Sequence, residues 1–342
     1  LILDEPTAAL NDDDSENLMQ LLKELKMEGI TSIMISHKLK EVISIADTVT
    51  VLRDGQTICS LDASKGEVSE PVLIKNMVGR AINDIFPKRE KKDIGDVALE
   101  IKNLNAHDHV SGRDILKNIH LNVRKGEVVG IAGLIDAGRT ELAYSIFGNP
   151  RGYSITGEIY MEGKQVTFKQ SGDAIKAGLA YVTEDRKREG LILIQDVKNN
   201  ISLANLKKLS KQGIVDENQE ITVATHYKEA LTIKTPSIEQ IIGNLSGGNQ
   251  QKVSVGKWLF TEPKVLILDE PTRGIDVGAK FEIYNIINKL IEQGMSIIMI
   301  SSELPEVISM SDRIYVMSEG RITGEMDAVD ATQDKIMELA TQ

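Results

Sequence analysis

The chain has 342 residues, of which 41% are apolar and 27% charged, and these proportions are typical of a folded globular protein of about two domains. Its formal net charge of −11 argues against a surface that binds nucleic acid. The single cysteine, Cys59, excludes an internal disulfide and is typical of a reducing compartment.

The N-terminal part of the chain, to about residue 58, is repeated later in one constant register. Asp4-Glu5-Pro6-Thr7 returns 265 positions later as Asp269-Glu270-Pro271-Thr272, and Gly55 matches Gly320 at the same offset. A register that holds over this length predicts two copies of one fold.

Each copy combines a short apolar strand, an amphipathic helix and a second apolar strand. These elements are expected at Leu1–Leu3, Ser15–Met27 and Thr31–Ile35 in the first copy, and at Val265–Leu268, Lys280–Glu292 and Ser296–Ile300 in the second. Short buried strands that alternate with helices predict a parallel sheet.

The two copies differ in what precedes them. The chain begins at Leu1, inside the repeated motif, whereas a long segment precedes the second copy. We therefore expect residues 1–80 to be the C-terminal part of a first, N-terminally truncated domain. Residues 81–95 are charged, contain a proline and are expected to form a solvated linker, and residues 96–342 are expected to form a complete second domain.

The second domain is expected to have three parts, which makes its fold class α/β. Residues Ala98–Leu104 and Ile119–Val123 alternate apolar with polar side chains and predict an antiparallel β subdomain beside the parallel sheet core. Residues from about 197 to 240 are polar and favour helices, so we expect a helical subdomain there.

A glycine-bounded loop follows the apolar strand Val128–Ala132 and precedes a helix expected at Glu141–Phe147. Gly133 and Gly138 lie at the two ends of this loop, where backbone N–H groups can surround phosphate oxygens. Thr140 follows and could bind Mg²⁺ through its hydroxyl. This strand, loop and helix together predict a phosphate-binding loop, or P-loop.

Two residues depart from the usual P-loop pattern. Arg139 stands where a lysine is expected, and its planar fork is not equivalent to an ammonium group in a tight phosphate cradle. Asp136 adds a carboxylate that should repel bound phosphate. We therefore predict a degenerate P-loop.

A second anion-binding turn is predicted at Leu245-Ser246-Gly247-Gly248-Asn249, before a helix that can extend to Leu259. Gly247 and Gly248 permit a close approach of the backbone to an anion, and Ser246 offers a hydroxyl. The N-terminus of the helix adds unpaired N–H donors and partial positive charge. The alternative interpretation is a serine-capped helix after a glycine turn.

These motifs resemble those of the ATP-binding subunits of ABC importers for monosaccharides such as ribose, galactose and xylose, which carry two nucleotide-binding domains. The resemblance covers nearly the whole chain and rests on residues 245–252, 257–259, 268–280 and 300–304, on the Gly138-Arg139-Thr140 variant and on residues 77–80. It implies the P-loop NTPase fold of ABC-type nucleotide-binding domains, with ATP and Mg²⁺ as cofactors.

The resemblance also implies catalytic roles in both copies. Asp4 and Asp269 would contact the metal, while Glu5 and Glu270 would polarise the attacking water. His37 matches the switch histidine of the family, whose counterpart in the second copy is Ser302.

Further roles follow for the nucleotide. Glu184 stands where the family usually has a glutamine and could still contact Mg²⁺, and His107 is a candidate for stacking on adenine. The segment Ser246–Asn249 would contact an ATP held mainly by the other domain.

The second copy has Arg139, Glu184 and Ser302 at three functional positions. We therefore expect the competent site to combine Asp4, Glu5 and His37 with the Ser246–Asn249 turn, and the chain as given to hydrolyse ATP poorly by itself.

The implied partners are membrane-spanning permease subunits and, indirectly, an extracytoplasmic sugar-binding protein, with no nucleic acid. The subunit would be peripheral, on the cytoplasmic face of the cell membrane. Two alternatives stay open, namely the ATPase of a purine nucleoside or autoinducer ABC importer, and a soluble ABC ATPase without a transport role. The residues that handle nucleotide do not identify the sugar.

Overall fold

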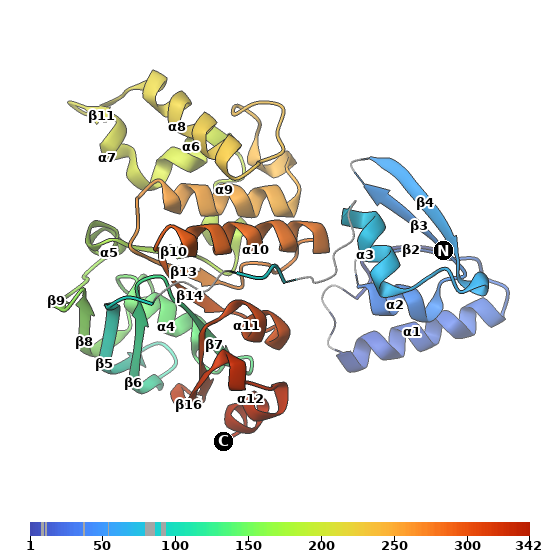
Figure 1. Cartoon of the computed structure of the whole chain (residues 1–342), viewed down its shortest axis with the longest axis horizontal. Coiled ribbons are helices and arrows are strands. Elements are labelled where there is room, and N and C mark those ends of the chain that lie inside the picture. Colours follow the sequence, from blue (N-terminus) through green and yellow to red (C-terminus); the bar gives the residue numbers. More distant parts are fainter. Residues whose placement is uncertain (8–9, 11, 37, 54, 79–85, 90–93) are drawn as a thin grey trace. The chain divides into compact units, whose positions relative to one another are not determined.

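The computed structural model describes the chain except for residues 8–9, 11, 37, 54, 79–85 and 90–93. It divides into two compact units, which Figure 1 displays. Unit 1 comprises Leu1–Ile85 with Asp276–Phe281, and unit 2 comprises Phe86–Ile275 with Glu282–Gln342. Within the described residues, no helix has both the length and the apolar character needed to cross a lipid bilayer.

Unit 1 begins with the strand–helix–strand pattern that the sequence predicts. Its elements are β1 (Ile2–Asp4), α1 (Asp12–Met27), β2 (Ile33–Ile35), α2 (Leu39–Ile45), β3 (Thr48–Arg53), β4 (Gln56–Asp62) and α3 (Glu70–Val78). Strands β1 and β2 are parallel, and β3 and β4 form an antiparallel hairpin. Leu39, Val51, Leu73 and Ile74 form a small core between α2, α3 and the hairpin.

Unit 2 is built on a six-stranded sheet with the order β10-β13-β14-β7-β15-β16. The strands are β7 (Val128–Gly133), β10 (Leu179–Val182), β13 (Val265–Asp269), β14 (Ser296–Ile300), β15 (Arg313–Ser318) and β16 (Arg321–Asp327). All neighbouring pairs are parallel except β15 with β16. Every residue of β10, β13 and β14 is buried, because parallel strands are covered on both faces.

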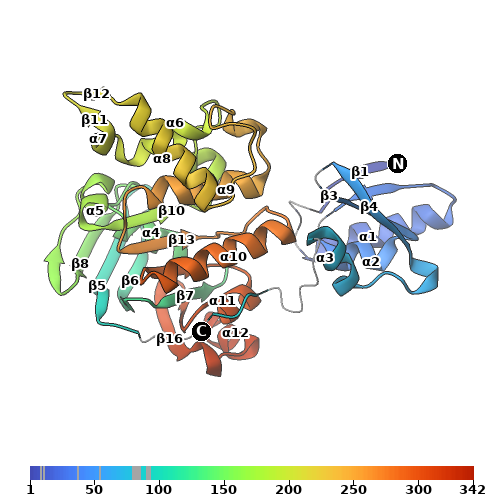
Figure 2. The same ribbon diagram turned by 45° about the horizontal axis from the view of Figure 1, so that its top comes forward.

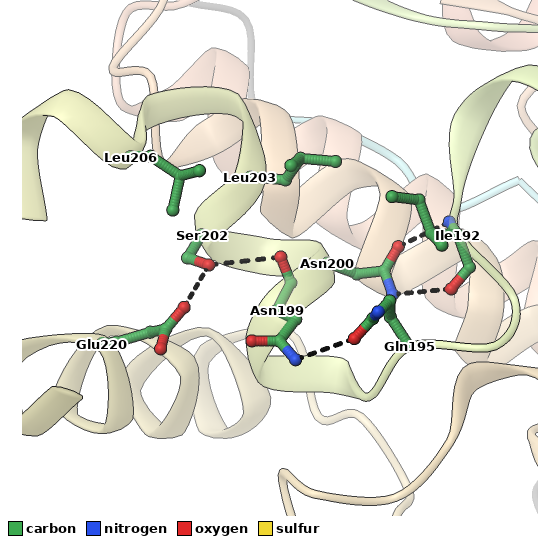
Figure 3. A pocket seen from close by; sticks show the side chains of 8 residues that line it. All are labelled: Ile192, Gln195, Asn199, Asn200, Ser202, Leu203, Leu206 and Glu220. Carbon is green, nitrogen blue, oxygen red and sulfur yellow. Dashed lines mark hydrogen bonds between the residues drawn. The ribbon is translucent and has the colours of Figure 1, made fainter. Parts of the chain in front are cut away.

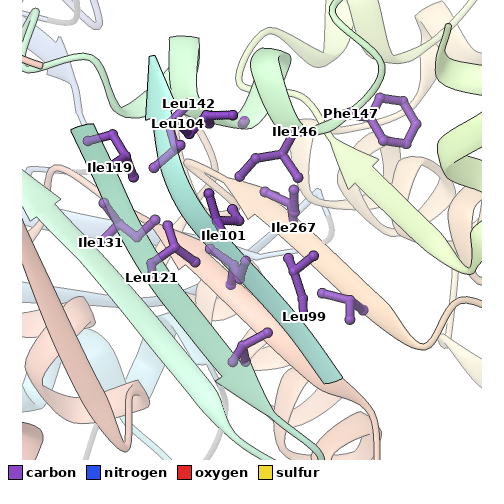
Figure 4. Close-up of a cluster of buried hydrophobic side chains, with 14 of the residues drawn as sticks. Leu99, Ile101, Leu104, Ile119, Leu121, Ile131, Leu142, Ile146, Phe147 and Ile267 are labelled. Carbon is purple, nitrogen blue, oxygen red and sulfur yellow. The ribbon is translucent and has the colours of Figure 1, made fainter. Parts of the chain in front are cut away.

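A separate antiparallel sheet confirms the predicted β subdomain. Its order is β6-β5-β8-β9, formed by β5 (Val97–Asp108), β6 (Arg113–Arg124), β8 (Ser154–Met161) and β9 (Lys164–Val166). Side chains of this sheet share one core with α4 (Arg139–Ile146) and with one face of the parallel sheet. Figure 4 shows this core, in which Leu99 and Ile119 of the antiparallel sheet gather with Ile131, Leu142 and Ile267.

Helices cover the rest of unit 2. They are α5 (Ser171–Ala177), α6 (Val197–Ser202), α7 (Leu206–Leu209), α8 (Glu217–Ala230), α9 (Gly247–Leu259), α11 (Leu304–Met310), α12 (Gln333–Ala340) and α10 (Val277–Glu292), whose residues up to Phe281 belong to unit 1. Figure 2 shows α6, α8 and α9 grouped as a helical layer, which agrees with the predicted helical subdomain. Residues of α11 and α12 pack on Ala132, Ile314 and Val316, which form a second cluster on the other face of the parallel sheet, because side chains alternate along strands.

The sequence repeat has a counterpart in the hydrogen bonds. The register of β1 with β2, Asp4 opposite Ile35, recurs as Asp269 opposite Ile300 in β13 and β14. The Thr7 hydroxyl donates to Glu41 at 2.8 Å, and 265 residues later the Thr272 hydroxyl donates to Glu306 at 2.9 Å. Local sequence therefore gives the same backbone path twice.

Residues 86–89 differ from the solvated linker that the sequence predicts. The ring of Phe86 lies 5.2 Å from that of Tyr284, between centroids, and Arg89 pairs with Asp312. The Asn288 side chain also donates to the Pro87 carbonyl at 2.9 Å. Burial of the Phe86 ring and pairing of Arg89 stabilise this packed arrangement. The number of charged residues in the segment does not predict it. Residues 81–85 and 90–93 of the predicted linker lie outside the described residues.

Gly320 and its repeat counterpart Gly55 differ in how closely they are packed. Both have left-handed backbones, with φ of 77° and 76°, but a Cβ on Gly320 would overlap the Ile115 carbonyl, whereas one on Gly55 would meet nothing within 4 Å. We expect Gly320→Ala to lower the free energy of unfolding of unit 2 by about 2–4 kcal/mol, from strain and overpacking.

Trp258, the single tryptophan, belongs to unit 2, so its fluorescence during urea unfolding measures this effect. Gly163→Ala, at an equally left-handed glycine of unit 2 (φ of 75°) where a Cβ would meet nothing within 4 Å, is the control and should cost only the backbone strain, about 1 kcal/mol. Equal shifts in the two variants would contradict the packing argument.

Candidate functional site

The predicted nucleotide site lies at the carboxyl edge of the parallel sheet. Strand β7 ends at Gly133, β13 at Asp269 and β14 at Ile300, and β10 ends at Val182, two residues before Glu184. Because the carboxyl ends of parallel strands share one edge, the P-loop, the Asp269-Glu270 pair and the segment after β14 meet there. Open α/β sheets generally bind ligands at this edge.

The P-loop has the strand, loop and helix that the sequence predicts. Gly138 is left-handed, with φ of 96°, and immediately precedes α4. Asp136 is also left-handed, with φ of 64°, a conformation that asparagine and aspartate tolerate better than most residues and glycine best of all. The Ala137 carbonyl accepts a hydrogen bond from the Gly320 N–H at 3.0 Å, which attaches the loop to the β15–β16 turn.

Arg139 points into the protein, toward the segment after β14. Its side chain is 9% exposed, and its Nη1 donates to the Ser301 carbonyl at 2.7 Å. The same nitrogen lies 3.7 Å from Glu270 Oε1. In this structure the guanidinium therefore lies beside the Glu270 carboxyl, and its predicted contact with nucleotide stays a prediction.

Asp269 is fully buried at the end of β13. The Tyr181 hydroxyl donates to its Oδ2 at 2.8 Å, while its Oδ1 is buried and has no hydrogen-bond partner among the described residues. Burial raises the pKa of Asp269 to about 6, and the hydroxyls of Tyr181 and Thr140 act in the opposite direction. An orphaned carboxylate oxygen beside a threonine hydroxyl suits Mg²⁺, which prefers hard oxygen ligands.

Glu270 is held in a strained conformation. Its φ of 47° is unfavourable for a residue with a Cβ, and its N–H donates to the Ile300 carbonyl at 2.9 Å. The Ser302 hydroxyl donates to its Oε2 at 3.0 Å. Burial raises the pKa of Glu270 to about 7, although Arg139 and Ser302 lower it.

Unit 1 repeats this turn. Asp4 ends β1, and Glu5 has a φ of 43° and donates its N–H to the Ile35 carbonyl at 2.8 Å. Strain retained at both positions is typical of functional residues. The predicted switch residue His37 lies outside the described residues.

The segment Ser246–Asn249, which we name the signature turn, leads directly into α9. Ser246 is exposed and occupies the N-cap position of α9, but its side chain makes no capping hydrogen bond. This observation argues against the serine-capped alternative and leaves first-turn N–H groups for an anion.

Asn249 orients the Ser246 hydroxyl. Its Nδ2 donates to Ser246 Oγ at 2.9 Å, while its Oδ1 accepts from the Lys234 N–H at 2.8 Å. The second bond fixes which end of the Asn249 amide faces Ser246. Because Ser246 Oγ accepts from Asn249, its own proton is available to a phosphate oxygen.

Two predicted contacts have protein partners in this structure. Glu184 pairs with Arg273, so metal binding by Glu184 would require this pair to separate. His107 Nδ1 lies 2.7 Å from Asp114 Oδ1, and its ring stacks edge-on with His109 at 5.0 Å between centroids. Both predicted roles stay predictions.

A cavity of about 310 Å³ lies in the helical subdomain, and Figure 3 shows the side chains that line it. The Ser202 hydroxyl donates to Glu220 Oε1 at 2.5 Å, and Asn200 bonds both backbone groups of Ile192. These bonds satisfy the buried polar groups of α6 and α8. None of the predicted nucleotide-binding residues lines the cavity.

Sequence reasoning missed one residue of the site and placed another wrongly. Tyr181 contacts Asp269 across 88 positions, so only pairing of β10 with β13 reveals it. By sequence, Arg186 and Lys187 are possible phosphate contacts, although a solvated charged loop is the favoured interpretation; in the structure Arg186 is only 9% exposed. For Arg186 that interpretation is wrong, and no local sequence signal distinguishes it from the exposed Lys187 and Arg188.

Comparisons with known proteins agree with this geometry. The family model described as ABC transporter matches residues 116–273. The chain is 56% identical to the L-arabinose transport ATP-binding protein AraG of Geobacillus stearothermophilus and 54% identical to the xylose import ATP-binding protein XylG of Thermoanaerobacter pseudethanolicus. In both alignments the whole chain is covered, and it spans 67% of the relative. The ribose import ATP-binding protein RbsA of Bacillus subtilis is 46% identical over the same shares of the two chains.

Solved structures show the same fold. A nucleotide-free ATP-binding cassette from an ABC transporter matches with a TM-score of 0.60 and 23% identity, covering 72% of this chain and 96% of that chain. A cassette in its ADP conformation matches with a TM-score of 0.58. The predicted ABC-type P-loop NTPase fold is therefore confirmed, and the chain belongs to the family of ATP-binding proteins of ABC sugar importers.

Proposed function

We propose that this chain couples ATP binding and hydrolysis to the uptake of a monosaccharide of the xylose, ribose or galactose class across the cytoplasmic membrane. The names of its relatives, which are arabinose, xylose and ribose import proteins, support this proposal. The observation that carries it is the uncapped signature turn, since N–H donors and a free hydroxyl proton at a helix N-terminus suit a phosphate group.

The carboxyl edge of unit 2 supplies the matching nucleotide contacts. Backbone N–H groups from Gly133 to Gly138 would surround the phosphates, and Thr140 and Asp269 would hold Mg²⁺. Bound Mg²⁺ would neutralise negative charge on the phosphate oxygens. Glu270, and Glu5 in the first copy, would orient and polarise the attacking water.

The domain assignment is part of the proposal. Residues 1–80 would belong to a first nucleotide-binding domain, residues 81–95 to a linker and residues 96–342 to a second domain with a degenerate P-loop. The repeated hydrogen bonds support it. The protein would bind membrane-spanning permease subunits at the cytoplasmic face, and an extracytoplasmic sugar-binding protein would deliver the substrate.

Reconstitution tests this function. The intact subunit, its permease and the associated sugar-binding protein are placed in liposomes, and ATP hydrolysis is measured with xylose, ribose, galactose, arabinose, a purine nucleoside or no solute. We expect stimulation by one or more monosaccharides. Stimulation by the nucleoside alone would contradict the proposal.

Replacing Ser246 provides the variant for this assay. Ser246→Arg removes the hydroxyl and fills the exposed turn, so we expect the sugar-stimulated rate to fall at least about 10-fold. Ser237→Arg, an exchange at a serine outside the signature turn, is the control and should retain most of the rate. An unchanged rate in Ser246→Arg would exclude the signature turn from the reaction.

A further inference from the structure

Arg186 is a buried arginine that bonds to backbone carbonyls. It begins the π-helix Arg186–Gly190, directly after the segment that follows β10. Nη1 donates to the Arg273 carbonyl at 2.7 Å, and Nη2 donates to the Gly274 carbonyl at 3.1 Å. These carbonyls belong to the turn after Asp269-Glu270-Pro271-Thr272. The Arg186 guanidinium thus connects the segment after β10 with the turn that follows the predicted catalytic pair.

The charge of Arg186 is not paired in the usual way. Within the part of the chain that the structure describes, its guanidinium nitrogens bond to two backbone carbonyls rather than to a carboxylate, and its buried Nε has no hydrogen-bond partner. Burial lowers the pKa of Arg186, against a smaller opposite effect of Asp185. A buried arginine held only for stability would gain from a carboxylate partner. The Arg186 guanidinium instead faces Gly247 of the signature turn.

The signature turn packs directly on this guanidinium. A Cβ on Gly247 would lie 2.8 Å from Nη2 of Arg186 and 3.0 Å from the Gly274 carbonyl oxygen. Gly247 is the first residue of α9, so the positive charge lies immediately behind the helix N-terminus. The guanidinium therefore adds to the partial positive charge of the helix at the place where we propose a phosphate.

The π-helix is fixed at both ends. The Asp185 carboxylate accepts from the Lys187 and Arg188 N–H groups at 3.0 and 3.1 Å. At the other end the buried Lys257 ammonium, near the end of α9, donates to the Gly190 carbonyl. The π-helix therefore contacts the start of α9 through Arg186 and Gly247, and the end of α9 through Gly190 and Lys257. These two contacts restrict where the Arg186 side chain can lie.

We propose that Arg186 is a positioning residue that holds the signature turn against the Arg273–Gly274 turn and adds positive charge behind its first N–H groups. This inference rests on the proposed ATPase function. Arg186 would act by fixing the position of the signature turn relative to a bound nucleotide. Arginine is required because only its fork donates to two successive carbonyls at once.

Arg186→Lys in the intact subunit tests the inference, with Arg188→Lys, an exposed position on the same π-helix, as the matched control. Lysine keeps the charge but cannot bridge both carbonyls. We expect kcat for ATP hydrolysis to fall about 10-fold while KM for ATP changes less than about twofold, because the turn acts on the transition state more than on ground-state binding. Arg188→Lys should match the unmodified protein.

Hydrogen–deuterium exchange gives a second readout that a merely structural role would not produce. In Arg186→Lys, exchange should increase in peptides that contain Ser246–Asn249 and stay unchanged in α8. Increased exchange throughout unit 2 would assign Arg186 a general folding role and overturn the inference, as would kinetics equal to those of the unmodified protein. Absence of ATP hydrolysis in the unmodified subunit would instead contradict the proposed function.

Discussion

Glu5→Gln in the intact subunit is expected to lower ATP hydrolysis by about 10²–10³-fold, whereas Glu270→Gln should lower it less than about 10-fold. Glutamine keeps the size of glutamate but cannot polarise the attacking water as a carboxylate does, and loss of such a group typically costs 10²–10⁴-fold. The two glutamates share the same strained turn, with φ of 43° and 47°. The difference between the variants therefore comes from their surroundings.

The surroundings of Glu270 oppose its use as a base. Its Oε1 lies 3.7 Å from Arg139, and its Oε2 accepts from Ser302 at 3.0 Å. A carboxyl that already has an arginine and a serine as partners has little capacity left for a water molecule. In the first copy the residue aligned with Ser302 is a histidine.

Steady-state hydrolysis by the two variants and the double variant Glu5→Gln/Glu270→Gln measures the difference. The double variant should hydrolyse ATP at a rate within about threefold of that of Glu5→Gln, because the second site adds little turnover. Equal losses in the two single variants would show that both sites hydrolyse ATP. A larger loss in Glu270→Gln would reverse the assignment of the competent copy.

Much of the fold follows from local sequence. The strands predicted at Val265–Leu268 and Ser296–Ile300 agree with β13 and β14 within one residue, because continuous apolar runs between polar turns have one stable arrangement in a covered sheet. The helix after the signature turn ends at Leu259, as predicted. The repeat predicted two copies of one fold, and Glu5 and Glu270 share one backbone conformation in the structure.

The direction of long polar side chains was not predictable. The spacing of the P-loop suggests that Arg139 faces phosphate, but the structure pairs it with the Ser301 carbonyl, 162 positions away. Likewise the bond from Tyr181 to Asp269 depends on the pairing of β10 with β13. Such contacts arise from sheet order, which local patterns do not contain. For the same reason a charged run gave no signal that Arg186 alone would be buried.

Glu270→Gln is also expected to stabilise unit 2 at alkaline pH, by about 3 kcal/mol at pH 8, with almost no effect near pH 4.5. The pKa of Glu270 rises from 4.5 to about 7 on folding, so the folded state binds the proton more tightly than the unfolded state. The neutral carboxyl contributes stability that is fully present below pH 4.5 and is lost as pH rises through about 7. Each pKa unit corresponds to about 1.4 kcal/mol, and glutamine does not undergo this loss.

Urea unfolding followed by Trp258 fluorescence between pH 4.5 and pH 8 measures the effect within unit 2. Asp269→Asn is the matched comparison, because burial raises the pKa of Asp269 from 3.8 to about 6. Its stabilisation should therefore grow only up to about pH 6, whereas that of Glu270→Gln should continue to grow to about pH 7. If Glu270→Gln is less stable than the unmodified protein at pH 8, Arg139 and Glu270 form a net stabilising ion pair. In that case Glu270 is a structural carboxylate, and its substitution should also release Arg139 from the Ser301 carbonyl.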